Sequence, residues 1–389
     1  MCHASRIGIG EGSMLRNWSV RNFNKVYRNL TDVVWHDGEH VAPRGQKTRE
    51  ILGNVIELAH PQERVLTVPG RRANPFFAWA ESAWILHGSR DIEWIAHYNS
   101  EMKKFLDADG VAWGVYGYRL RYAAGYDQLE VAVNRLTQDP DSRRGVLSLW
   151  HATLDATEGH ADYPCNAMVF LKLRDKKLHM TVLNRSNDLH LGLAAVNVCQ
   201  WTTIQETLAC ALDAEPGVYR HYSDSLHIYE ESVHTQAVLA GADFDVYEHV
   251  KPTRIGGSLA QNYKDVETVF DLSVALRRYW LEKPVVLSLM SDFSSPYWQA
   301  CAKALVAWDS LKCGVFNATF ETLVSMLPAC PDWYVALVEF ALRYVEKRVA
   351  LATPSVVSGY REICLERLAR SIPLSSESQG AILRYWEAH

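Results

Sequence analysis

The residue best suited to chemistry in this sequence is Cys165, which stands in the run Tyr-Pro-Cys-Asn at 163–166, directly before a segment with strand character. A side chain at the start of a strand can reach a cleft, and a neighbouring guanidinium group lowers the pKa of a thiol toward the reactive thiolate. A lone cysteine is more often a packed core residue than a nucleophile. A catalytic role for Cys165 therefore depends on which polar residues the fold brings to it.

Arginines and other polar side chains recur beside predicted strands. Arg143 and Arg144 lead into one strand, and Arg185 opens the run Arg-Ser-Asn-Asp that closes a hairpin. A guanidinium group can bind two phosphate oxygens at once, although paired arginines are usually solvated surface residues. His227 and Tyr229 are spaced so that both polar tips leave a strand on the same side. Each of these signals is weak alone, and they are compatible with a small anionic substrate.

The hydrophobic pattern predicts the elements that carry these residues. Apolar residues at helical spacing predict helices at 17–37, 75–87, 129–137 and 197–212. Short apolar or alternating runs predict strands at 51–58, 145–150, 166–173 and 177–183, the last two forming a hairpin, with a loop at 41–47. Beyond about Gly256 the pattern is mainly helical, with amphipathic segments at 296–312 and 331–347.

This change of character predicts two units. Residues 1–255 form an α+β catalytic domain, and residues 256–389 form a mainly helical C-terminal extension. The extension shows no cluster of metal-ligating residues. We expect it to bury core surface, stabilise a dimer or contact a partner; the alternative is a lid that shapes ligand access to the catalytic domain.

The composition limits the class of protein. The 389 residues are 48% apolar and 22% charged, with a net charge of -5, which gives no reason to expect binding to nucleic acid or membranes. The eight cysteines form no CxxC pair, so we expect no metal. The N-terminus lacks a signal-peptide pattern, and the expected compartment is the reducing cytoplasm.

The polar residues form an ordered series along the chain. It consists of Asp-Pro-Asp-Ser-Arg-Arg at 139–144, Pro-Cys at 164–165, Asn-Arg-Ser-Asn-Asp at 184–188, Leu-Gly-Leu at 191–193, Asn197 and His-Ile-Tyr at 227–229. In order and spacing this series resembles the signature of the thymidylate synthase superfamily. Upstream, 81–88 resembles the family's helix with the catalytic glutamate, 115–117 its tyrosine turn, and Arg44 its mobile phosphate-binding arginine. The resemblance covers about 17–247 and implies that family's mixed sheet with packed helices.

The resemblance also implies a reaction. Cys165 would add to C6 of a pyrimidine nucleotide and make C5 nucleophilic toward the one-carbon unit of 5,10-methylenetetrahydrofolate. Glu81, with a pKa raised by burial, would relay protons near the base, and Tyr116 would help remove the C5 proton. Asn197 would read the edge of the base.

The remaining roles follow residue by residue from the same resemblance. Catalytic roles fall to Cys165, Glu81, Tyr116, Asn197 and Asp188. The nucleotide would be bound by Arg44, Arg143, Arg144, Arg185, Ser186, Asn197, His227 and Tyr229, the last two at the sugar hydroxyl. The folate would be bound by Glu81, Met102, Asp188, Leu191 and Gly192. Arg143 and Arg144 would act on the neighbouring subunit's site, because the family's homodimer shares its sites.

Several departures from a synthase favour a hydroxymethylase. Met102 and Phe105 occupy the positions of two tryptophans that cover the reaction intermediate in synthases, and Asn166 replaces the usual histidine after the nucleophile. One residue is inserted before Asn197, and the family's C-terminal tail is not recognisable near 251–257. A looser cofactor face would admit water, which adds to the methylene at C5 and gives a hydroxymethyl product. The chain therefore resembles the pyrimidine nucleotide 5-hydroxymethylases of the superfamily.

Several alternatives remain open. An amide at Asn197 favours dUMP as substrate, whereas a carboxylate there would favour cytosine, so dCMP and CMP are the alternative substrates. Reductive methylation by a thymidylate synthase proper is the alternative reaction. A catalytically inactive nucleotide-binding or RNA-binding homologue is the alternative class.

Overall fold

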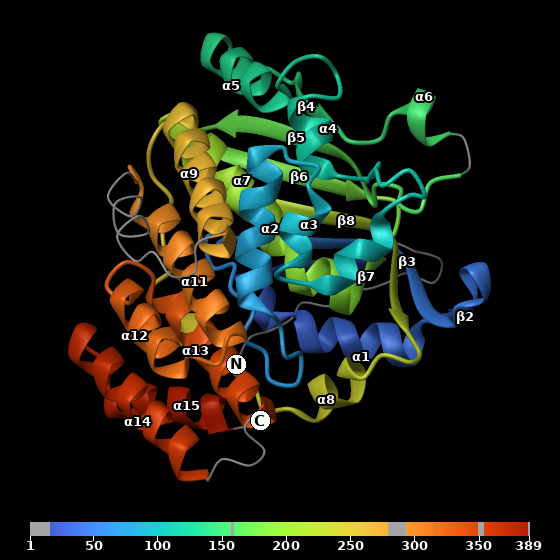
Figure 1. Cartoon of the computed structure of the whole chain (residues 1–389). Helices are drawn as coiled ribbons and strands as arrows, with labels where there is room; N and C mark the ends of the chain where they lie inside the picture. The colour runs from blue at the N-terminus through green and yellow to red at the C-terminus, as the bar shows by residue number, and fades with distance from the viewer. Residues whose placement is uncertain (1–15, 157–158, 279–292, 349–353, 388–389) are drawn as a thin grey trace.

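The computed structural model describes residues 16–156, 159–278, 293–348 and 354–387 (Figure 1). Its centre is an eight-stranded mixed sheet with the order β1-β3-β8-β6-β5-β4, in which β2 pairs with β3 and β7 with β8. The strands are β1 (Arg16–Val20), β2 (Glu39–Val41), β3 (Thr48–Leu58), β4 (Gly145–Ser148), β5 (Asn166–Arg174), β6 (Lys177–Asn184), β7 (Asn187–Asp188) and β8 (Glu215–Tyr229). The predicted α+β fold with a mixed sheet is confirmed.

The predicted hairpin is formed by β5 and β6, which pair antiparallel. Its turn is made by Asp175 and Lys176, whose φ angles of 49° and 56° match the left-handed backbone of a tight hairpin turn. β8 lies at the middle of the sheet, antiparallel to β3 and parallel to β6. The ends of β5, β6, β7 and β8 therefore carry most residues with predicted roles.

The predicted opening helix at 17–37 is wrong in its first part. Residues Arg16–Val20 form β1, which pairs in parallel with β3, so that Asn17 lies opposite Val55. The helix α1 covers only Tyr27–Asp37. Pairing with a strand far along the chain decides this segment, and no local pattern records such a pairing.

Two helices form successive layers over the sheet next to the site. They are α7 (Val198–Ala211), which packs on β6 and β8, and α2 (Pro75–His87), as predicted, which packs on α7. Local sequence sets the ends of α2: the Asn74 side chain accepts a hydrogen bond from the Phe77 amide, and Gly88 ends the helix with a φ of 78°. All residues of α2 from Pro75 to Leu86 are buried, so the helix is covered on every side. The other helices of this part are α3 (Ile92–Ala96), α4 (Tyr116–Arg121), α5 (Gln128–Gln138), α6 (Ala152–Asp155) and α8 (His234–Ala240).

The C-terminal part is helical, as predicted. Its helices are α9 (Leu259–Arg278), α11 (Pro296–Lys312), α12 (Phe316–Met326), α13 (Pro331–Arg348), α14 (Pro354–Ser371) and α15 (Ser376–Glu387). In Figure 1 they gather on one side of the molecule, coloured yellow-orange to red, and α9, α11 and α13 contact α2. Trp79 of α2 stacks on Trp333 with 4.2 Å between ring centroids and lies edge-on to Tyr297 at 5.2 Å. The extension therefore completes the hydrophobic core around α2; the boundary near Gly256 stays a prediction.

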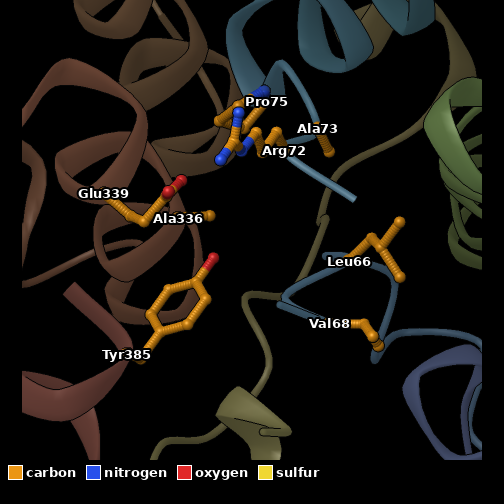
Figure 2. Close-up of a pocket in the computed structure, with 8 residues that line it drawn as sticks. All are labelled: Leu66, Val68, Arg72, Ala73, Pro75, Ala336, Glu339 and Tyr385. Carbon is orange, nitrogen blue, oxygen red and sulfur yellow. The ribbon is translucent and has the colours of Figure 1, made fainter. Parts of the chain in front are cut away.

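A small cavity lies where the extension meets the core (Figure 2). It measures about 10 Å³, room for about one water molecule, between Arg72 on one side and Glu339 and Tyr385 on the other. None of the residues with predicted roles lines it. It is therefore a packing gap between the loop that precedes α2 and the helices α13 and α15, and not the predicted site.

Candidate active site

The predicted nucleophile, Cys165, lies where a loop meets the start of a strand. Cys165 is half-buried and directly precedes β5, and its carbonyl oxygen accepts a hydrogen bond of 3.0 Å from the Arg185 amide. Burial raises the pKa of the Cys165 thiol; Arg185 and Arg44 lower it, and Asp162 raises it further. The arginines act in the predicted direction, but in the free protein burial outweighs them and keeps the thiol protonated at neutral pH.

Arg185 also fixes the backbone that precedes the nucleophile. Its guanidinium donates hydrogen bonds of 3.1 Å to the carbonyl oxygens of Pro164 and Tyr163 and lies 5.7 Å from the centre of the Trp150 ring. Two bonds from one planar group define the position of the loop. Arg185 thus orients Cys165 and also brings a positive charge to it.

Tyr116, at the first position of α4, contacts the residue that follows Cys165. Its hydroxyl accepts a hydrogen bond of 3.4 Å from the backbone amide of Asn166, and its ring faces Trp201 at 6.3 Å. Burial raises the pKa of the Tyr116 phenol well above its usual value, and the charges of Cys165, Asp162 and Glu81 raise it further. Tyr116 therefore stays protonated within electrostatic reach of both the thiol and the carboxyl group.

A glycine lets α4 approach the helix that carries Glu81. A Cβ atom on Gly117 would lie 2.5 Å from the carbonyl oxygen of Ile85, which is closer than van der Waals contact allows. Any side chain here would push α4 away from α2. Gly117 therefore helps to set the spacing between Tyr116 and Glu81.

Glu81 is a buried acid on α2, as the sequence predicted. Its exposed fraction is 9%, and burial raises the pKa of its carboxyl group to about 8, an effect that the side-chain amide of Gln200 partly opposes. Its Oε2 atom has no hydrogen-bond partner within the described ranges. Near neutral pH Glu81 is mostly protonated, so it can both give and take a proton.

Asn197 lies at the end of a π-helical segment, η4 (Leu189–Asn197), which runs directly into α7. The one-residue insertion that the sequence indicated falls inside this segment. A π-helical turn takes up one extra residue without ending the helix, and such turns are frequent at functional sites. Asn197 is 6% exposed and contacts the side-chain amides of Asn187 (3.3 Å) and Gln200 (3.3 Å).

Asp188 anchors the start of the same segment. Its carboxylate accepts hydrogen bonds from the amides of His190 (2.7 Å) and Leu191 (2.9 Å), an N-terminal cap. Burial raises the pKa of Asp188. The two backbone hydrogen bonds that its carboxylate accepts, and the charge of His227, oppose that rise. Asp188 lies opposite His227 in the pairing of β7 with β8.

His227 and Tyr229 leave β8 on one side, as predicted, with their rings edge to face at 5.4 Å. Burial lowers the pKa of His227, so the ring is neutral near pH 7. Burial raises the pKa of Tyr229, which also responds to the charges of Asp188, Arg44 and Cys165. The two side chains therefore offer neutral hydrogen-bonding groups at the mouth of the site.

Arg44 and Ser186 are nearer the solvent. Arg44 lies in an exposed turn, η2 (Pro43–Gly45), with a φ of 55° that few non-glycine residues adopt. Its charge still acts on Cys165 and Tyr229. Ser186 is half-buried and directly follows Arg185.

Arg143 and Arg144 are not brought to this site. Both are exposed and precede β4, which runs antiparallel to β5 so that Gly145 lies opposite Leu171. At about 3.3 Å per residue, the arginines lie roughly 25 Å from Cys165, toward the opposite end of β5. They cannot contact a nucleotide that is bound at Cys165 of the same chain.

The predicted folate-facing residues differ in their surroundings. Met102 is 9% exposed and belongs to the hydrophobic core, whereas Leu191 is 59% exposed and Phe105 is 39% exposed. Gly192 is tightly packed, because a Cβ atom there would lie 3.0 Å from Asn187 Oδ1 and would displace that amide by a few tenths of an ångström. Whether Gly192 also contacts the folate stays a prediction.

Sequence reasoning missed four polar residues that the structure adds. They are Asp162, Asn187, Gln200 and His221. Burial raises the pKa of Asp162 to about 6, while Arg119 and Arg185 lower it. The position of Asp162 three residues before the nucleophile was a usable signal. Asn187 stood inside the series at 184–188 without an assigned role. Nothing in the pattern marked Gln200 or His221, because a strand or helix residue that faces the core is usually apolar.

Membrane-spanning and metal-binding features are both missing from the part of the chain that the structure describes. None of its helices combines the length and apolar character that a bilayer crossing requires. Nor do three or more acidic, histidine or cysteine side chains of the described residues converge as metal ligands would.

The part of the chain that carries these site residues is similar to known proteins. The family model described as thymidylate synthase matches residues 25–243. The chain is 39% identical over 217 residues to the deoxyuridylate hydroxymethyltransferase of Bacillus phage SP01, covering 53% of this chain and 56% of that protein. It is 40% identical over 182 residues to the enzyme of the same name from Pseudomonas phage M6, covering 46% of this chain and 52% of that protein. It is 28% identical over 208 residues to a putative thymidylate synthase of Methanothermobacter thermautotrophicus (strain Delta H), covering 52% of this chain and 89% of that protein. The chain thus spans about half the length of the phage relatives that it matches.

Proposed function

This chain belongs to the thymidylate synthase family, and we propose that it transfers a hydroxymethyl group to C5 of dUMP. The observation that carries the proposal is the convergence of Cys165, Tyr116 and Glu81 from three separate segments, close enough for each charge to act on the Tyr116 phenol. A nucleophile beside a carboxyl group that can give and take a proton, and a phenol that can relay one, is what addition to C6 and proton removal at C5 require. The phage relatives named as deoxyuridylate hydroxymethyltransferases support this choice of base and product.

The first step belongs to Cys165. Its Sγ, as the thiolate, forms a bond to C6, and the electrons of the C5–C6 double bond move to C5 and O4. The phosphate of the nucleotide is bound near Arg44 and Arg185. Its negative charge raises the pKa of the Cys165 thiol, and the positive charges of the two arginines must offset this rise for the thiolate to form. Protonated Glu81 stabilises the charge on O4.

The folate supplies the one-carbon unit at the oxidation level of formaldehyde. The exposed Leu191 next to the cap of Asp188 fits such a ligand, because it offers apolar surface for a flat ring beside a carboxylate. A water molecule hydrogen-bonded to Tyr116 takes the proton from C5 after the new carbon–carbon bond has formed. The electron pair left behind forms the double bond of a methylene group on C5, and the bond from that carbon to the folate nitrogen breaks to release tetrahydrofolate. Water then adds to the C5 methylene, and Cys165 leaves as the C5–C6 double bond reforms.

Shared sites in a homodimer are part of the proposal. The exposed Arg143 and Arg144, far from Cys165 of their own chain, are suited to bind phosphate in a partner's site. The sheet face away from the helices exposes apolar residues such as Leu52 (48%) and Val146 (38%). A second copy on that face would bury them.

Product analysis tests the proposal. Purified protein is incubated with 5,10-methylenetetrahydrofolate and one of the four nucleotides dUMP, dCMP, UMP and CMP in separate reactions. The masses of the product nucleotides are then measured by mass spectrometry. We expect dUMP to gain CH₂O, with tetrahydrofolate released. A gain of CH₂ with dihydrofolate release would instead show a synthase. Faster turnover of dCMP or CMP than of dUMP would show that the preferred base is cytosine and not uracil. No turnover with any of the four nucleotides would exclude this catalytic role.

A further inference from the structure

A chain of buried polar side chains leads from the centre of the sheet to Asn197. Its members, each at most 6% exposed, are Tyr219, His221, Asn184, Asn187 and Asn197. They come from β8, β6, β7 and η4, so only the fold brings them together. Buried polar groups cost free energy unless they are paired, so a chain of this length has consequences for the group at its end.

The direction of the chain is fixed by a backbone group. The carbonyl oxygen of Tyr222 can only accept, so the side-chain amide of Asn184, 2.8 Å away, must present its Nδ2 there. The same Nδ2 lies 2.8 Å from Nε2 of His221, which must therefore accept the second N–H. His221 is then neutral and donates from Nδ1 to the Tyr219 hydroxyl at 2.7 Å. Burial, which lowers the pKa of His221 to about 3, agrees with a neutral ring.

His221 in turn orients Asn187. The Nε2 atom of His221 also lies 2.8 Å from Nδ2 of Asn187, so its single lone pair is shared between the N–H groups of Asn184 and Asn187. The opposite rotation of this amide would set its oxygen against the lone pair of Nε2 and is disfavoured. With Nδ2 turned inward, Asn187 uses its second N–H for Oδ1 of Asn197, at 3.3 Å.

The amide of Asn197 is therefore held at both ends. Its Oδ1 accepts from Asn187, and its Nδ2 donates to Oε1 of Gln200 at 3.3 Å. Gly192 fits this arrangement, since a Cβ atom there would lie 3.0 Å from Asn187 Oδ1, a tight contact, and at ordinary contact distance, 3.4 Å, from Asn197 Oδ1. Each end keeps one lone pair or one N–H for a ligand.

The orientation of this amide matters for the base. Uracil offers a donor at N3 and an acceptor at O4, whereas cytosine offers an acceptor at N3 and donors at N4. A freely rotating amide could read either edge by exchanging its ends, but a fixed amide reads only one. A polar group that meets the wrong edge is left unpaired, and such mismatches cost large factors in kcat/KM.

We propose that His221, acting through Asn187, is the positioning residue that makes this protein discriminate between uracil and cytosine. This inference rests on the proposed function, because it requires Asn197 to read the base. His221 touches neither the nucleotide nor Asn197; it selects which end of the Asn197 amide faces each position of the base.

The test compares kcat/KM for dUMP and dCMP in a small set of variants. His221→Phe removes the acceptor, and Asn187→Leu removes the link at similar volume. We expect the ratio of the two kcat/KM values to move toward one by about tenfold or more in each. His221→Gln keeps an acceptor near the Nε2 position and should retain the wild-type ratio.

Gln205→Leu is the matched control. Gln205 is a fully buried amide on α7 that donates to the carbonyl oxygens of Leu178 (2.8 Å) and Gly217 (3.1 Å) and lies outside the chain that ends at Asn197. Its loss should lower stability without changing the ratio. If His221→Phe does not fold, Asn187→Leu and Gln205→Leu still give the comparison.

Three outcomes separate this inference from the proposed function. A wild-type protein that turns over dUMP, with an unchanged ratio in Asn187→Leu, overturns the positioning role alone. An equal change of ratio in Gln205→Leu also overturns it, because a general loss of packing would then suffice. If the wild type turns over neither nucleotide, the proposed function fails, and the dissociation constants of dUMP and dCMP, measured by calorimetry on the same variants, decide the positioning role.

Discussion

Arg185 and Cys165 are joined twice, once through the backbone and once through charge. The Arg185 amide donates to the Cys165 carbonyl oxygen at 3.0 Å, and the Arg185 guanidinium lowers the pKa of the thiol while it holds the two residues before it. Replacing Arg185 therefore affects both the position and the ionisation of the nucleophile.

Arg185→Ala is expected to raise the pKa of Cys165, because the charge that opposes burial is removed. The pH midpoint for alkylation of Cys165 by iodoacetamide, followed by peptide mass spectrometry, should move upward. kcat/KM for dUMP should fall by about 10- to 100-fold, the effect of losing one charged hydrogen bond. Arg174→Ala, at the far end of β5, is the control and should change neither quantity. An unmoved alkylation midpoint in Arg185→Ala would contradict this account.

Cys165→Ala should reduce turnover by at least about 10³-fold while dUMP binding survives. Covalent addition requires the thiol, whereas binding relies on the arginines and on Asn197. Product formation and calorimetric binding are measured on the same preparation. Cys313→Ala, which removes an exposed cysteine, should leave both unchanged. Substantial turnover by Cys165→Ala would end the proposed mechanism.

Glu81→Gln should lower kcat by about 10²- to 10⁴-fold, because an amide keeps the shape of the acid but cannot transfer a proton. The same substitution should make the folded protein relatively more stable at high pH, although it lowers kcat. The folded protein holds the Glu81 proton up to about pH 8, whereas an unfolded carboxyl group releases it near its ordinary pKa of 4.5.

Between these two values the unfolded state binds fewer protons, so the Glu81 carboxyl contributes a loss of stability as pH rises, complete above about pH 8. Glu81→Gln removes this contribution. Melting temperatures of both proteins from pH 5 to pH 9 should therefore diverge with rising pH, with the variant becoming relatively more stable. Parallel curves would show that Glu81 is not protonated in the folded protein.

Mixing two inactive chains tests the shared site. Arg143→Ala lacks the phosphate ligand that we assign to the partner's site, and Cys165→Ala lacks the nucleophile. After unfolding and refolding together at equal amounts, half the dimers are mixed, and each mixed dimer has one complete site. Activity should then recover to about a quarter of the wild-type value. Absence of recovery, with dimers present in size-exclusion chromatography, would argue against sites shared in this way.

Trp333→Ala tests the role of the C-terminal extension. Trp333 is 1% exposed and stacks on Trp79 of the helix that carries Glu81. Loss of this ring should lower the free energy of unfolding by about 3–5 kcal/mol, measured by urea denaturation. The Michaelis constant for folate should change little below the melting temperature, and truncation near Gly256 should mainly lower solubility. Val274→Ala on α9, 37% exposed, is the control. A stable Trp333→Ala or a soluble truncation with only a folate defect would favour a lid.

Local sequence determined the elements whose signals are local. The limits of α2 follow from an asparagine cap, an apolar run and a glycine stop, and the hairpin of β5 and β6 follows from alternation around a short turn. The order of the polar residues along the chain was enough to indicate the family, because these side chains lie at element ends that the hydrophobic pattern marks. The burial of Glu81 also follows from its apolar helix.

Tertiary structure decided everything that depends on contacts between distant segments. β1 exists because β3 pairs with it, and the pKa of Cys165 depends on how burial balances against Arg185 and Arg44. The orientation of Asn197 is set by His221, through strands that meet only in the folded sheet. Hydrophobic periodicity records which face of an element is buried, but it holds no information about which buried groups meet. For that physical reason the site's residues were visible in the sequence, while their protonation states and orientations were not.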